Sequence, residues 1–128
     1  MVVPAPASFR ETFATLRGIL EPHAKKLSIT RDEPSDYQLS SSTRTDRVGR
    51  PLFAAGVRLG KSYVSYHFMP IYACPELLAE LSPVLRKRMQ GKACFNFKTI
   101  DAAEVKKLAA LTKKGLARFD KIKVPWGA

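Results

Sequence analysis

Alternation of apolar and polar residues across the stretch 52–69 constrains the fold of this chain more than any other feature of its sequence. Such alternation is typical of strands with one buried face. Gly60 and Lys61 interrupt it near the middle, and a glycine followed by a polar residue suits a two-residue turn. The pattern therefore predicts a hairpin, with a register in which Arg58 faces Tyr63.

The two faces of this hairpin differ in chemistry. One face carries the larger apolar side chains and is expected to pack against helices: Phe53, Ala55, Val57, Val64, Tyr66 and Phe68. The other carries small or polar side chains: Ala54, Gly56, Arg58, Tyr63, Ser65 and His67. Because Ala54 and Gly56 are small, this second face is expected to form a shallow polar hollow beside His67.

The rest of the chain predicts an α+β fold. Apolar residues recur at helical spacing after residue 8 and again after Asp101, which predicts an amino-terminal and a carboxyl-terminal helix. Residues 26–42 indicate one or two exposed strands, 75–89 two short helices that begin at prolines, and the segment after Gly91 a further strand. We therefore expect a single antiparallel sheet packed against N- and C-terminal helices.

A single domain is expected over residues 1–128. A chain of 128 residues, 45% of them hydrophobic, buries about two thirds of its unfolded surface around one core. Residues 1–7 are interpreted as a flexible arm, 8–119 as the folded core and 120–128 as a tail.

Charge narrows the range of partners. The chain has 22 Lys and Arg residues against 11 Asp and Glu residues, for a formal net charge of +11. This balance favours anionic partners. We expect a small or anionic ligand, a protein partner or a nucleic acid, and a chain that is a monomer or a homodimer. No membrane partner is expected, because no apolar run reaches the roughly 20 residues of a membrane span.

The two cysteines, Cys74 and Cys94, are too few for a disulfide framework and lack the paired spacing of a zinc site. With no pattern of a secretory signal at the start, this favours a reduced protein of the cytoplasm.

No catalytic residues are predicted. His67, Ser65 and Tyr63 share a strand face, but no acidic residue in the predicted pairing would orient the imidazole for general-base catalysis. The segment "GVRLGKSY" is similar to a phosphate-binding loop, yet Ala55 stands where that motif requires glycine, and a strand follows instead of a helix. We therefore expect a non-enzymatic protein.

The predicted ligand site is the polar face of the sheet. Its residues are Arg58, Tyr63, Ser65, His67, Asn96 and Lys98, with Gln38 possible on a neighbouring strand. Arg58 and Lys98 would supply charge, and Asn96 and Ser65 would orient the ligand. His67 would be a pH-sensitive donor or acceptor, whereas His23 is interpreted as a charge at the end of the first helix.

Nucleic-acid binding is the main alternative. Arg44, Arg47 and Arg50 lie in one predicted loop, and lysines line the outer face of the last helix. Such residues contact phosphates, although surface lysines also serve simply to solvate a helix. The polar face has few exposed aromatic residues beyond Tyr63, which counts against a stacking platform for single strands.

The segment "YVSYHFMPIYACPELLAELSPVLRKRMQGKACFNFKTIDAAEVKKLAAL" resembles the YdhG-like family of bacterial domains of unknown function, and the likeness extends from about Phe9 to Phe119. The resemblance implies a frataxin-like fold and, for one branch, a role in handling intracellular iron. An iron-binding chaperone is thus a second alternative, with iron the one cofactor implied. The acidic cluster Asp32, Glu33 and Asp36 offers a sparse set of oxygen ligands for such a cation.

Overall fold

The computed structural model describes residues 7–119 and residue 121. The predicted arm, apart from Ala7, and the predicted tail, apart from Lys121, lie outside the described residues. The helices are α1 (Ala7–Leu20), the short 3-10 helix η1 (Glu21–Lys25), α2 (Met69–Ala73), α3 (Glu76–Ala79), α4 (Pro83–Arg88) and α5 (Ala102–Phe119). The strands are β1 (Leu27–Glu33), β2 (Asp36–Thr45), β3 (Pro51–Leu59), β4 (Val64–Phe68), β5 (Met89–Gln90) and β6 (Cys94–Phe97).

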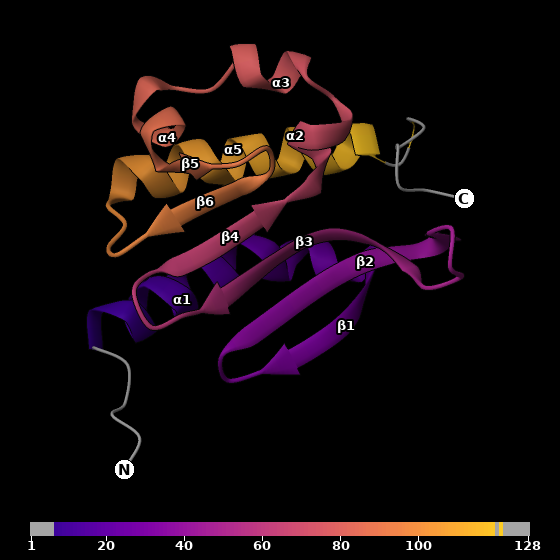
Figure 1. Ribbon diagram of the computed structural model, residues 1–128, viewed down its shortest axis with the longest axis horizontal. Helices are drawn as coiled ribbons and strands as arrows, with labels where there is room; N and C mark the ends of the chain where they lie inside the picture. Colours follow the sequence, from indigo (N-terminus) through magenta and orange to yellow (C-terminus); the bar gives the residue numbers. More distant parts are fainter. Residues whose placement is uncertain (1–6, 120, 122–128) are drawn as a thin grey trace.

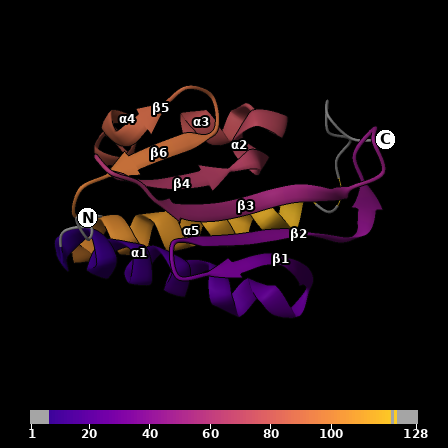
Figure 2. The ribbon, with the colours of Figure 1, turned by 60° about the horizontal axis from the view of Figure 1, so that its bottom comes forward.

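The strands form one six-stranded sheet in the order β1-β2-β3-β4-β6-β5, and every neighbouring pair is antiparallel. The two long helices, α1 and α5, lie against the same face of this sheet (Figure 1), and Figure 2 shows them side by side beneath it. The predicted α+β architecture, a single antiparallel sheet with N- and C-terminal helices, is therefore confirmed.

The hydrophobic core fills the space between the sheet and these two helices. Leu16 of α1, Phe68 of β4 and Leu108 of α5 are each fully buried there. One polar pair is enclosed with them, since the Tyr66 hydroxyl and the Thr112 hydroxyl are hydrogen-bonded. Burial raises the pKa of Tyr66 above its usual range, and the bond to Thr112 offsets only part of this effect.

The turn between β3 and β4 differs from the predicted one. The Gly60 amide donates to the Tyr63 carbonyl at 3.0 Å, so the two residues between them form the centre of the turn. Arg58 consequently pairs with Ser65 instead of Tyr63. Glycine is required at position 60 because the backbone of Tyr63 lies close to it: a Cβ on Gly60 would lie 2.8 Å from the Tyr63 carbonyl oxygen. The predicted register is wrong by two residues, and an even shift keeps the β4 side chains on their predicted faces.

A β-bulge changes the faces at the start of β3. Leu39 of β2 pairs with Ala55, while the next residue, Ser40, pairs with Phe53, which leaves Ala54 as an extra residue. Ala54 and Ala55 are both fully buried in the core, whereas Phe53 is half-buried outside it. The predictions that Phe53 lies on the helix-facing side and Ala54 on the polar side are wrong, because the bulge inverts the alternation.

Within residues 7–119 and 121, no helix combines the length and the apolar character needed to cross a membrane.

Candidate functional site

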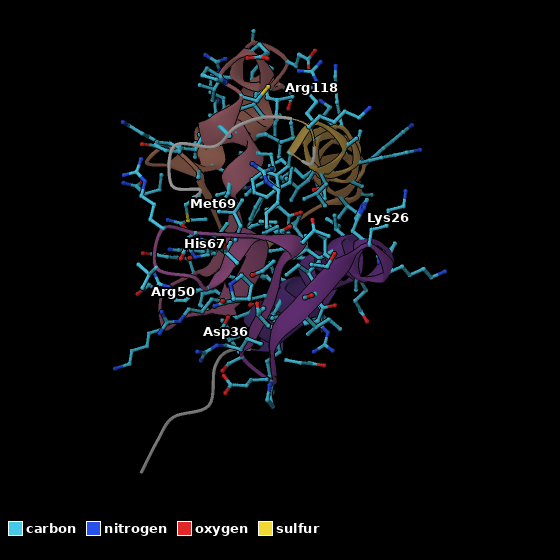
Figure 3. All side chains as sticks on the ribbon, turned by 90° about the vertical axis from the view of Figure 1, so that its right-hand side faces the viewer. Lys26, Asp36, Arg50, His67, Met69 and Arg118 are labelled. Atoms are coloured by element: carbon cyan, nitrogen blue, oxygen red, sulfur yellow. The ribbon has the colours of Figure 1, made fainter. Side chains whose placement is uncertain are left out.

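The predicted polar face is the face of the sheet opposite α1 and α5; Figure 3 shows His67, Met69 and Asp36 on that side. Pairing of β3, β4 and β6 places Arg58, Ser65 and Asn96 in one row across the sheet. His67 lies in the adjacent row. The structure thus brings together four of the six predicted ligand-binding residues.

The other two predicted residues lie apart from this row. Tyr63 belongs to the turn before β4 and is 42% exposed. Lys98 follows the end of β6 and is exposed, and its backbone carbonyl accepts a hydrogen bond from the Thr12 hydroxyl of α1. Neither side chain is held by the strand pairing that orders the row.

Several polar groups of this face are already bonded to one another. The Ser65 hydroxyl donates to Asn96 Oδ1 at 3.1 Å, and the Cys94 thiol lies 3.5 Å from the same oxygen. Gln38 Nε2 donates to Asp36 Oδ1 at 3.2 Å. A ligand on this face would have to compete with these internal hydrogen bonds.

The predicted hollow beside His67 is filled. A Cβ on Gly56, the cross-strand neighbour of His67, would lie 3.2 Å from Phe53 Cζ and 3.2 Å from Gln38 Cγ. The Phe53 ring therefore covers the glycine. Burial lowers the pKa of His67; nearby Asp36 raises it in part, and Arg58 lowers it further. The sequence reasoning missed the influence of Asp36 on His67.

Replacing Phe53 with alanine is expected to raise the pKa of His67 toward its ordinary value of about 6.5, because water would reach the imidazole. The measurement is an NMR titration of the two histidine rings of the chain. His23 is an internal control, because it lies in η1 on the helix side of the sheet, away from Phe53, and its titration should not move. An unchanged His67 titration would show that Phe53 does not cause its burial.

The acidic residues considered for a cation do not converge. Asp32 pairs with Arg17 of α1 at 2.9 Å, whereas Glu33 and Asp36 face each other across β1 and β2, each beside Arg31. Over the described part of the chain, no group of three or more His, Cys, Asp or Glu side chains is arranged to hold a metal ion.

The arginines near the β2–β3 connection are engaged within the protein. Arg44 donates to the carbonyl oxygen of Phe119 at 2.7 Å. Arg50 Nε pairs with Asp46 Oδ2 at 3.0 Å. Since both guanidinium groups hold structural partners, the predicted basic loop presents less uncommitted charge to a nucleic acid than its sequence indicates.

A different site lies on the helix side of the sheet. We call it the basic cavity: a pocket of about 340 Å³ between η1, the start of β1 and the end of α5. It is lined by Pro22, His23, Lys25, Lys26, Leu27, Lys113, Leu116 and Ala117. Figure 3 shows Lys26 on the side of the helices, opposite His67. Every ionisable side chain that lines it is basic, and its remaining lining is apolar.

These basic side chains lack acidic partners. None of Lys25, Lys26 and Lys113 forms an ion pair with a carboxylate of the described chain. Burial lowers the pKa of His23, and the charges of Lys113 and Lys26 lower it further. The cavity therefore has a positive potential that an anion would neutralise.

In two other cavities, some of the basic residues already have partners. Beside α3 and α4, Lys114 forms an ion pair with Glu80, and both line a pocket of about 500 Å³. In the pocket next to α2, Lys92 lies over the Tyr72 ring at 5.4 Å, and Arg86 donates to a backbone carbonyl. The basic cavity differs from both in the number of its basic side chains, four against two in each, with no carboxylate among its lining residues.

Comparisons with protein-family models, with curated proteins and with solved structures give no match for this chain. The functional proposal is therefore based on the residues of the chain itself. Sequence reasoning missed the basic cavity because His23 was interpreted as a helix-end charge. The one local signal was the cluster of His23, Lys25 and Lys26, since Lys113 joins them only through the fold.

Proposed function

We propose that this chain is a non-enzymatic protein of the cytoplasm that binds a small anion in the basic cavity. The observation that carries the proposal is the combination of three lysines and one histidine with no carboxylate among the lining residues. The two cysteines are unbridged thiols, which supports a reducing compartment.

The chemistry of the lining suits a carboxylate or a phosphate. Lysine ammonium groups on flexible stems adapt to either anion and form charge-assisted hydrogen bonds with it. An anion beside His23 would favour the imidazolium form, which adds a further donor. Leu27 and Leu116 line the same cavity with apolar surface, and charge-assisted hydrogen bonds are stronger beside such surface than in open water.

The polar face of the sheet is the competing location for the same function. It has Arg58 and the exposed Lys98, but its central polar groups are bonded to one another and Phe53 fills the space beside His67. The two locations are on opposite faces of the sheet, so they can be tested separately.

The double variant Lys26→Gln with Lys113→Gln is expected to bind phosphate about tenfold or more weakly, because each substitution removes a charge-assisted hydrogen bond. The measurement is an NMR titration of the protein with inorganic phosphate at low ionic strength. The matched control is the double variant Arg58→Gln with Lys98→Gln, which removes the same net charge from the sheet face.

Equal loss in the two double variants would indicate a nonspecific effect of net charge, and loss only in the Arg58 and Lys98 variant would move the site to the sheet. Either result would contradict the proposal. Circular dichroism of each variant verifies that the fold is retained.

A further inference from the structure

A groove adjoins the basic cavity. It is a cavity of about 530 Å³ between α1 and α5. Its lining residues are Thr15, Gly18, Ile19, Pro22, His23, Val105, Ala109 and Lys113. We call it the helix groove. The two spaces share Pro22, His23 and Lys113 in their linings, so they lie side by side.

Charge is confined to one end of the combined site. His23 and Lys113 are the ionisable residues of the helix groove, and both also line the basic cavity. Beyond them the groove presents small and apolar side chains, including Gly18, Val105 and Ala109. The site therefore has a basic end and an uncharged, mostly apolar continuation.

The sequence of α5 explains why this continuation stays open. The helix buries Leu108, Leu111 and Leu116 in the core, while Val105 and Ala109 are only half-buried. These two residues face α1 where its own residue is Gly18, and a Cβ on Gly18 would contact nothing within 4 Å.

We propose that the ligand of the basic cavity is a free single-chain amphiphile, whose anionic head lies between Lys26, Lys113 and His23 and whose apolar chain lies in the helix groove. This inference rests on the anion-binding function proposed above and assigns its chemical class. From Val105 to Lys113 the helix rises about 12 Å, which matches on the order of eight to ten extended carbons.

Charge complementarity selects the head, and burial of the chain supplies additional affinity. An ammonium head would be repelled by the three lysines of the basic cavity. An anion without a chain would leave the half-buried Val105 and Ala109 in contact with water. Each methylene that leaves water completely is expected to tighten binding about fourfold.

The experiment compares butyrate, hexanoate, octanoate and decanoate below their micelle concentrations, with octylammonium as the charge control. Binding is measured by calorimetry and by NMR titration of His23, with His67 as the internal reference. Octanoate should bind at least tenfold more tightly than butyrate, and it should raise the pKa of His23. Octylammonium should not bind in the basic cavity.

A variant that blocks only the helix groove tests the contribution of the ligand's apolar chain separately from that of its anionic head. Gly18→Leu is accommodated because open space surrounds this position, and it should abolish the advantage of octanoate over butyrate while phosphate binding stays unchanged. Ala103→Leu, at an exposed position of α5 outside both cavities, is the matched control and should bind like the native chain.

The outcomes separate the two proposals. Equal affinity for butyrate and octanoate, with both lost on removal of Lys26 and Lys113, would overturn the amphiphile and leave the anion site intact. If neither phosphate nor any carboxylate shifts the His23 signals, both proposals fail. The chain-length comparison uses the native protein, so it stands even if Gly18→Leu does not fold.

Discussion

Replacing Glu104 by glutamine is expected to lower the free energy of unfolding by about 2 kcal/mol, because it neutralises the buried partner of an ion pair whose other side chain, Arg88, is 36% exposed. The Glu104 side chain is 3% exposed, and its Oε2 lies 2.9 Å from Arg88 Nε. Its other oxygen accepts from the amide of Asp101, while its own amide donates to the Asp101 carboxylate. Glu104 therefore caps α5 and joins it to α4.

Denaturant unfolding measures this loss, and Glu80→Gln is the matched control. Glu80 also forms an ion pair with a base, Lys114 of α5, but that pair is exposed. Its loss should cost less than about 1 kcal/mol. Similar effects of the two substitutions would show that burial does not decide the strength of these pairs.

Gly115→Ala is expected to destabilise the protein by about 1 to 3 kcal/mol, even though alanine favours a helix. Gly115 lies in α5 against β4. An added Cβ would lie 2.5 Å from Cζ of Phe68 and 3.1 Å from Cβ of Pro70. Phe68 is fully buried, so its ring has no space into which it can move.

Gly18→Ala is the same substitution, but it is expected to have the opposite effect on stability. Gly18 is also within a helix, α1, but nothing lies within 4 Å of an added Cβ. This variant should be more stable than the native chain by about 0.5 to 1 kcal/mol. Thermal or denaturant unfolding of the two variants measures whether each is more or less stable than the native chain. A stabilised Gly115→Ala protein would contradict the described packing of α5 on Phe68.

Most of the architecture could be predicted because it depends on periodic patterns. Alternation in β3 and β4 and the helical spacing after Asp101 each repeat over several residues. The bulge at Ala54 could not be predicted, since a single extra residue has no period. Its consequence is large, because it moves Phe53 to the polar face and closes the expected hollow.

From the sequence, an anionic partner could be proposed but the basic cavity could not be located. Net charge indicated an anionic partner, but it did not distinguish bases that already have partners from those that do not. Arg50 and Arg88 hold Asp46 and Glu104 respectively. Lys113 reaches His23 only because α1 and α5 lie side by side, and no local pattern relates residues so far apart in the chain.

The position of α1 and α5 in the chain has a consequence for the order of folding. The strands β1, β2, β3 and β4 are neighbours both in sequence and in the sheet, and such local pairing favours rapid folding. Contact between the first and last long helices instead closes the longest loop of the chain, which carries the largest entropic cost. The helix groove is therefore expected to form last and to open first, so a ligand held there would join the two ends of the chain and slow their separation.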